Sequence, residues 1–415
     1  MGGDRRRSVL HWCDTLSIRK PVSLLVVGGG IGGLATALAA ARAGRRVHVI
    51  EKSPEFTEIG AGLQLAPNAT RMLDRLGLLE RVLPSATFPK NLVMMDAVTG
   101  LPLTRLDLGP AFRAHYGHPY IVMHRGDLLA AELEACRSEP LITLDAGREA
   151  VSVESADDVV RVTCADGSVF EAEAVVGADG LWSLVRKAVH DDGDPICAEY
   201  VAYRGTIPRA DAPSGTALDN MTIWVGPEMH FVQYVIHGGT LLNQVAVFRS
   251  HRFRSGCESL EDWGTPDELD NAFAPLCPAV RDAVRFIRRD RRWPMFDRLP
   301  ISRWTRGRIT LLGDAAHPML QYIAQGACQA LEDAVCLGDA LARHEDPRQA
   351  FLAYEAERIP RTARVQQTAR FFGELKHLDG TGRAVRNALL QKRAADDFEY
   401  FDFLYGDSTA SPSPK

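Results

Sequence analysis

The pattern of apolar and polar residues near the N-terminal end predicts a strand, a helix and a second strand. Val22–Val27 is a short apolar run, which is typical of a buried parallel strand. Leu34–Ala43 is rich in alanine and predicts a helix that Gly44 ends, and Arg46–Glu51 predicts the next strand. These three elements, within about 30 residues, form a βαβ unit and indicate a parallel sheet.

The following region continues this mixed pattern. Helices are predicted over 68–76 and 126–136, and the alternation within 150–164 indicates a strand. Asp166–Gly167 predicts a turn, after which 169–176 leads back to the parallel sheet. The first part of the chain is therefore expected to be an α/β domain.

The pattern changes near residue 200, where strand-like segments are separated by turns rich in Gly, Pro and Asp. These segments are 202–207, 222–225, 230–236 and 241–248. They predict an antiparallel sheet inserted into the first domain. Beyond it, Ile309–Leu312 predicts a buried strand, Gly326–Arg343 a long helix, and Thr362–Leu390 a mostly helical segment.

These elements predict an α/β fold in which a Rossmann-type domain carries an inserted sheet. We place the first domain at 22–195 and 293–345, the inserted antiparallel-sheet domain at 196–292, and a C-terminal helical segment at 346–405. Both ends, 1–20 and 407–415, are expected to be disordered. The first 20 residues have no long apolar core, so no secretory signal is predicted.

Net charge argues against a nucleic-acid-binding protein. The formal charge is -5, whereas a phosphate backbone requires a basic face. One exception is Arg285–Arg292, with five arginines around Asp290. A solvated helix face explains this run better than a docking patch for an anionic cofactor.

The eight cysteines predict reduced thiols in a cytoplasmic protein. None forms a CxxC pair, and no Cys/His cluster has the spacing of zinc ligands, so no metal site is predicted.

Val22–Ala41 lacks charge over 20 residues, the length of a membrane span. Five glycines between Gly28 and Gly33 would break such a helix, so a strand, a turn and a helix are predicted instead, without a transmembrane segment.

The first motif with chemical meaning is the glycine-rich turn from Gly28 to Gly33, directly after the first strand. Gly28 permits the tight turn, Gly30 lets the backbone approach a pyrophosphate, and Gly33 allows close packing of helix and strand. Glu51 ends the second strand, 21 residues beyond Gly30, where a carboxylate binds the adenosine ribose. This motif predicts a dinucleotide but does not separate FAD from NAD.

The second motif favours FAD. Ile309–His317 is a buried strand that ends in Gly313-Asp314, where the acid can hold the ribityl hydroxyls of a flavin. The helix that begins near Gly326 would direct its N-terminal dipole at the flavin ring. The alternative for Asp314, taken alone, is a helix or turn cap, which the pattern favours less.

A third motif adds candidates for the pyrophosphate. This motif spans residues 175–186: another predicted strand ends in Asp179-Gly180, and Ser183 and Arg186 follow one helical turn apart. Arg125 is a further candidate, and its alternative is an ordinary surface arginine.

These three motifs, in this order, resemble the class A flavoprotein aromatic hydroxylases, FAD-dependent monooxygenases. The resemblance rests on GxGxxG with a distal Glu, on GADGLWSLVR at 177–186 and on GDAAHP at 313–318, and it extends over about Ser23 to Tyr405. Residues 56–68 match the second loop that contacts the cofactor in this family. The resemblance implies further FAD contacts at Ile31, Lys52, Gly62, Leu63, Pro318, Gly326 and Ala327.

Within the family, the chain resembles the 3-hydroxybenzoate 6-hydroxylase subgroup. The matching segments are 88–91, 202–206, 230–234, 242–248, 293–297 and 375–381. Many relatives have a proline four residues after the GDAAH run, whereas this chain has Gln321, in agreement with the subgroup. Its amide can bind a substrate oxygen beside the flavin.

The resemblance implies a two-step reaction. A nicotinamide cofactor reduces FAD, and the reduced flavin takes up O2 to form a C4a-hydroperoxide that hydroxylates the aromatic ring. His230 and Tyr234 lie four residues apart on one predicted strand and therefore share a face, which the resemblance assigns to the substrate pocket. His230 would accept the phenolic proton and Tyr234 would donate to the substrate hydroxyl. The alternative is that both are packed sheet residues.

Several alternatives stay open. The absence of a second GxGxxG leaves NADH and NADPH undecided, although the subgroup favours NADH. A salicylate-type hydroxylase or a tailoring enzyme for another aryl acid would share most motifs, as would a flavin-binding interaction module without hydroxylase activity. A homodimer is compatible with the sequence.

Overall fold

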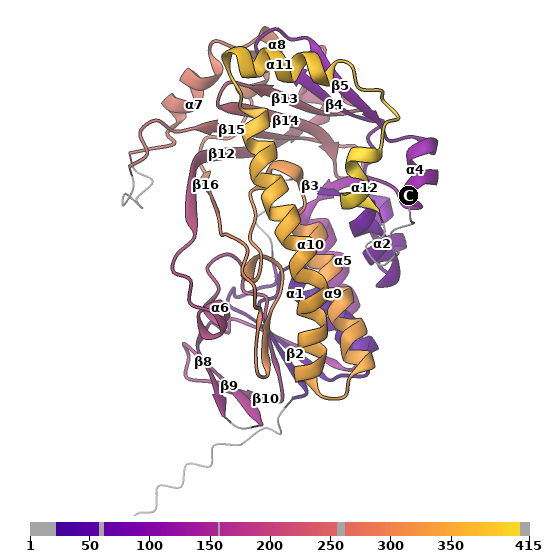
Figure 1. Ribbon diagram of the computed structural model, residues 1–415, viewed down its shortest axis with the longest axis vertical. Helices are drawn as coiled ribbons and strands as arrows, with labels where there is room; N and C mark the ends of the chain where they lie inside the picture. Colours follow the sequence, from indigo (N-terminus) through magenta and orange to yellow (C-terminus); the bar gives the residue numbers. More distant parts are fainter. Residues whose placement is uncertain (1–21, 58–61, 157, 255–261, 407–415) are drawn as a thin grey trace, which may run out of the picture.

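Two sheets placed along the long axis form the framework of the protein in a computed structural model (Figure 1). The structure describes residues 22–57, 62–156, 158–254 and 262–406, so the termini expected to be disordered lie outside the described residues. The lower sheet has six strands in the spatial order β17 (Thr305–Arg306), β18 (Ile309–Leu311), β11 (Val175–Gly177), β1 (Leu24–Val27), β2 (Val47–Glu51) and β7 (Ile142–Ala146).

The lower sheet confirms the predicted Rossmann-type unit. β1 pairs in parallel with β2 on one side and with β11 on the other, and all four of its residues are buried. Helix α1 (Ile31–Arg42) packs against α9 (Gly326–Arg343), where a Cβ atom at Gly338 would lie 2.7 Å from the Cβ of Ala39. Small residues on both helices therefore permit their close approach.

The upper sheet has seven strands and takes more of the chain than predicted. Their order is β16 (Arg292–Asp297), β12 (Ile196–Pro208), β15 (Leu241–Arg249), β14 (Met229–Ile236), β13 (Met221–Gly226), β4 (Asn91–Asp96) and β5 (Pro102–Asp107). The boundaries 196–292 therefore omit β4 and β5, and almost all of β16. Their strand partners lie far away in the sequence, and local alternation does not reveal such pairing.

One face of the upper sheet is covered by α7 (Pro266–Phe273) and α8 (Pro278–Val284). Phe231 and Phe248 of the sheet pack there in one apolar cluster with Phe273 and Val280 of these helices. The five arginines at 285–292 follow α8 and do not form a helix face, so that interpretation was wrong. Arg288 pairs with Asp290, and Arg289 pairs with Asp270.

Helix α10 (Pro347–Lys376) runs along the molecule from the lower sheet to the upper sheet, beside α9 (Figure 1). The predicted helical segment 362–390 is in fact the end of α10 followed by α11 (Gly380–Leu390), with α12 (Glu399–Tyr405) beyond it. Pro360 lies inside α10, although proline disfavours a helix interior. Buried ion pairs of Arg358 and Arg361, on either side of Pro360, hold the helix in place.

The remaining helices and strands surround the lower and upper sheets. They are β3 (Gly62–Leu65), α2 (Pro67–Arg75), α3 (Leu79–Val82), η1 (Leu83–Ser85), α4 (Pro110–Tyr116), β6 (Ile121–His124), α5 (Arg125–Arg137), β8 (Ala150–Ala156), β9 (Val159–Cys164), β10 (Val169–Ala172), α6 (Leu184–Val189), η2 (Arg209–Asp211), η3 (Gly313–Ala315) and η4 (Gln321–Ile323). Within the described ranges, no helix is long and apolar enough to cross a membrane. The same residues contain no cluster of His, Cys, Asp and Glu that could hold a metal ion.

Candidate active site

A cavity of about 1480 Å³ lies between the two sheets. Gly28, Glu51 and Asp314 line it from the lower part, and His230 and Tyr234 line it from β14 of the upper sheet. Pockets for single drug-sized ligands measure roughly 300–1,000 Å³, so this cavity has room for a dinucleotide together with a small ligand.

The glycine turn at the lower end fits a pyrophosphate. Gly28 has φ +110°, and a Cβ atom there would lie 2.3 Å from the carbonyl oxygen of Ala178. A Cβ at Gly33 would lie 1.9 Å from the carbonyl oxygen of Gly28, so Gly33 serves helix–strand packing and does not line the cavity. Gly30 and Ile31 line the cavity at the N-terminus of α1, where free N–H groups favour an anion.

Glu51 stands at the end of β2 with its carboxylate held in place. One oxygen accepts from the backbone N–H of Gly29 at 2.8 Å, and the other accepts from that of Ser53 at 2.8 Å. A carboxylate oxygen can accept more than one hydrogen bond, so Glu51 can also bind ribose hydroxyls. Lys52, next to it, lines the same part of the cavity.

Asp314 lies where β18 ends and its side chain is exposed to the cavity. Surrounding protein nevertheless desolvates this carboxyl and raises its pKa. Gly326 and Ala327, at the start of α9, line the cavity close by, as do Gly62 and Leu63 of β3. This edge therefore presents an acid, a helix N-terminus and a strand where the flavin half of FAD is expected.

Pro318 does not line the cavity, contrary to its predicted contact with the cofactor. It is buried, and its carbonyl oxygen accepts from the side chain of Gln366 at 3.0 Å. The chain turns inward after Asp314 and returns to the cavity at Met319.

Asp179 and Arg125 line the cavity, whereas Arg186 does not. Asp179 also accepts from the backbone N–H of Leu184 at 2.8 Å and so caps α6. The guanidinium of Arg186 is buried, bonded to Asp192 and to the carbonyl oxygens of Ala315 and Ala316. The predicted contact of Arg186 with the pyrophosphate was therefore wrong, because Arg186 instead supports the loop that carries Asp314.

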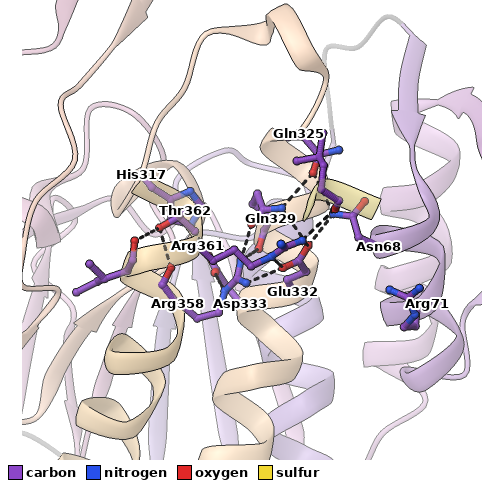
Figure 2. A network of polar contacts seen from close by, with 12 residues as sticks. Asn68, Arg71, His317, Gln325, Gln329, Glu332, Asp333, Arg358, Arg361 and Thr362 are labelled. Atoms are coloured by element: carbon purple, nitrogen blue, oxygen red, sulfur yellow. Dashed lines mark hydrogen bonds and ion pairs between the residues drawn. The ribbon is translucent and has the colours of Figure 1, made fainter. Parts of the chain in front are cut away.

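A buried paired network lies behind the cavity and was missed from the sequence (Figure 2). We use this name for His317, Glu332, Asp333, Arg358 and Arg361. Asp333 accepts from Nε2 of His317 at 2.5 Å, from Arg358 at 2.7 Å and from the backbone N–H of Gly313 at 3.0 Å. It therefore fixes the backbone directly before Asp314.

The other carboxylate of the paired network connects three helices. Glu332 of α9 accepts from Arg358 and Arg361 of α10. It also accepts at 2.6 Å from the side chain of Asn68 in α2, which donates to Gln325 at 2.9 Å as well (Figure 2). Long-range pairing of this kind has no local sequence signal.

His230 and Tyr234 share one face of β14 and both reach the cavity, as the strand pattern predicted. Burial, together with the charges of Lys376 and His377, lowers the pKa of His230 well below its usual value, so its imidazole is neutral. Burial raises the pKa of Tyr234 to about 12, so its hydroxyl stays protonated and can donate. A Cβ at Gly62 would lie 2.6 Å from the ring of Tyr234, so only glycine leaves room for this tyrosine.

Arg204 is a site residue that the sequence analysis missed. It lines the cavity from β12, its guanidinium lies 5.8 Å from the Trp293 ring, and no described carboxylate pairs with it. It donates a hydrogen bond to Oε1 of Gln321, which is also in the cavity wall. A guanidinium only donates, so the carbonyl oxygen of Gln321 faces Arg204. Its NH2 group donates one hydrogen to Sδ of Met295 at 3.8 Å, and the second hydrogen is left for another acceptor. An arginine in an apolar strand was the signal that could have found it.

Lys376 is a second cation that was missed. Its side chain is buried at the end of α10, lines the cavity and donates to the carbonyl oxygen of Tyr322 at 2.7 Å. Burial lowers the pKa of Lys376 to about 7. The pocket wall therefore combines two cationic side chains with a neutral imidazole and a phenolic donor.

Comparisons with known proteins agree with this geometry. Residues 21–369 match the family described as FAD binding domain. The 3-hydroxybenzoate 6-hydroxylase of Klebsiella oxytoca is 40% identical over 93% of this chain and 97% of its own length. The 3-hydroxybenzoate 6-hydroxylase 1 of Aquipseudomonas alcaligenes is 40% identical over 93% and 98%. The solved structure of Klebsiella pneumoniae HpxO with FAD and uric acid is 26% identical, covers 92% of this chain and 96% of that one, and has a TM-score of 0.80.

Proposed function

Since this chain belongs to the family of FAD-binding aromatic hydroxylases, we propose that it converts 3-hydroxybenzoate to 2,5-dihydroxybenzoate in the cytoplasm, with NADH and O2 as co-substrates. When bound, FAD would supply the redox chemistry: it would accept hydride from the nicotinamide and pass one oxygen atom of O2 to the aromatic ring, while the other oxygen atom leaves as water. The protein must bind the aryl acid, manage its phenolic proton and exclude water.

The observation that carries this proposal is the polar set on the pocket wall. The neutral imidazole of His230 accepts the phenolic proton, and the hydroxyl of Tyr234 donates to the same oxygen. Arg204, together with the NH2 group of Gln321, binds the carboxylate. A phenol that also carries a carboxylate uses all four groups.

The lower end of the cavity accounts for the cofactor. We assign the pyrophosphate to the glycine turn and Arg125, the adenosine ribose to Glu51, and the ribityl chain to Asp314. Gly326 and Ala327, on the remaining lower wall, would hold the flavin ring.

The test is NADH oxidation by the purified holoenzyme in air, with 3-hydroxybenzoate, salicylate and 4-hydroxybenzoate as substrates and product identification by mass spectrometry. Of these three substrates, we expect only 3-hydroxybenzoate to stimulate NADH oxidation, and we expect its product to be 2,5-dihydroxybenzoate. Catechol from salicylate would favour a decarboxylating hydroxylase instead. Replacement of NADH by NADPH decides the nicotinamide preference.

A further inference from the structure

A second histidine stands directly behind His230. Nδ1 of His230 lies 2.9 Å from Nε2 of His377, and the two rings are nearly parallel, at 22° with centroids 5.1 Å apart. His230 lines the cavity, whereas His377 does not. His377 keeps 8% of its surface exposed, compared with 2% for His230. The two rings, which we call the imidazole pair, therefore form a step from the cavity toward the surface.

The imidazole pair is held by backbone on both sides. His230 belongs to β14, and His377 is the C-terminal cap residue of α10, with its N–H bonded to the carbonyl oxygen of Gly373 at 3.2 Å. The carbonyl oxygen of His377 accepts from the backbone N–H of Glu228 at 3.1 Å. The His377 ring also stacks on Tyr200, with centroids 4.5 Å apart. The hydrogen bond between the rings is thus preorganised.

We propose that His377 is the second member of a proton relay that carries the phenolic proton of the substrate out of the cavity through His230. The inference rests on the proposed function, since it needs a phenol in the cavity. The substrate O–H bond breaks and its proton joins Nε2 of His230. In the same series of transfers, the proton on Nδ1 of His230 passes to Nε2 of His377, and the proton on Nδ1 of His377 leaves to solvent. Both rings end neutral, in exchanged tautomers, and the substrate is left as the phenolate.

The charges around the imidazole pair favour passage of the proton over its storage. The titratable groups that face it are Lys376 of α10, Arg386 of α11, Tyr200 of β12 and Tyr322 of η4. Two carboxylates lie further out: Asp96 is 3.7 Å from Arg386, and Glu228 pairs with Arg249 and His251. Burial, Lys376 and Arg386 lower the pKa of His377 to about 3. An imidazolium is therefore unstable on either ring, while a phenolate beside Lys376 is favoured.

The experiment measures proton release when the oxidised holoenzyme is mixed with 3-hydroxybenzoate. A pH indicator in weak buffer follows the release by stopped flow, without NADH and therefore without turnover. His377→Gln retains a hydrogen-bonding partner for His230 but cannot pass a proton, and we expect release to slow by about 10²-fold. His251→Gln is the matched control, because it changes an exposed histidine in the same way.

FAD content, substrate affinity and unfolding temperature of the His377→Gln holoenzyme are measured alongside. Release at the wild-type rate in His377→Gln overturns the relay. Slow release with unchanged FAD content and affinity supports it, and rescue of the rate by added imidazole supports it further. A wild-type enzyme that hydroxylates 3-hydroxybenzoate yet releases no proton overturns the relay alone. A wild-type enzyme that hydroxylates none of the hydroxybenzoates overturns the proposed function and the relay with it.

Discussion

The paired network and the imidazole pair are both buried, and both link α10 to the cavity wall, but their charges differ. In the paired network, two carboxylates face two arginines, and each carboxylate accepts at least two hydrogen bonds from side chains. Around the imidazole pair, the nearest charged side chains are the cations Lys376 and Arg386, without a carboxylate from the described residues bonded to either ring. The first cluster is compensated by its own ion pairs. In the second, Arg386 lies 3.7 Å from the carboxylate of Asp96, whereas no carboxylate among the described residues pairs with Lys376.

This difference separates groups that hold the structure from groups that can exchange protons. Burial alone would raise the pKa of Asp333, but His317 and Arg358 outweigh it and lower that pKa to about 2. Asp333 therefore stays ionised at every pH at which the protein works. Lys376 has no such partner in the part of the chain that the structure describes, and its pKa of about 7 brings its titration into the working range. Uncompensated burial is typical of groups that take part in reactions.

Removing a cation from the paired network should have the largest effect on the protein, through its stability. Arg358→Met leaves Glu332 and Asp333 with fewer cations in a buried site, and we expect a loss of about 3–5 kcal/mol in the free energy of unfolding, measured by urea denaturation of the holoenzyme. Arg348→Met, on the exposed side of the same helix, should leave the unfolding curve unchanged. Equal curves for both variants would mean that the paired network contributes nothing to stability.

The next largest effect is expected at His230, and it concerns the rate of hydroxylation and not the stability. His230→Gln removes the proton acceptor in the cavity, and we expect hydroxylation to slow by about 10²-fold, or about 2.7 kcal/mol in activation free energy. Single-turnover product formation from the reduced enzyme gives this rate. FAD content and the free energy of unfolding should stay near wild type. A variant that lost FAD instead would place His230 among the structural residues.

A smaller effect is expected on the binding of the substrate carboxylate by Arg204. Arg204→Met removes a charge-assisted hydrogen bond of about 1.5–3 kcal/mol, so the dissociation constant of 3-hydroxybenzoate should rise roughly 10-fold or more. Optical titration of the flavin measures it. The affinity for 3-hydroxybenzamide, which has no carboxylate, should change much less. An equal loss for both ligands would show that Arg204 acts through the position of Gln321 only.

The smallest effect, taken per pH unit, is the dependence of stability on the ionisation of Lys376. Because burial lowers its pKa from 10.5 to about 7, the unfolded chain binds this proton between those values while the folded chain does not. Stability of the wild type should therefore rise with pH from about 7 upward relative to Lys376→Met, by about 1 kcal/mol per pH unit. Urea denaturation at pH 7.5, 8.5 and 9.5 tests this. Lys187→Met, an exposed lysine, should show no such difference from wild type.

The elements closest to the cofactor could be predicted from the sequence because local geometry dictates their residues. Gly28 has a positive φ and no room for a side chain, and Glu51 ends the strand next to it. His230 and Tyr234 follow from strand alternation once the strand is located. Lys376 and His377 could not be found in this way, since each gains its meaning from partners far away in the sequence.

The sequence by itself determined the Rossmann-type unit, the strand-like segments of the inserted sheet between 202 and 248, and the order of the cofactor motifs. These features depend on spacing along the chain, on glycine conformation and on hydrophobic periodicity, all of which are local. Only the tertiary structure decided that β4, β5 and β16 join the upper sheet, that Arg186 turns away from the cavity, and that α10 brings His377 within 2.9 Å of His230. Pairing between distant strands, and the burial that shifts a pKa, arise only when separated segments pack together, and no local pattern encodes which segments those are.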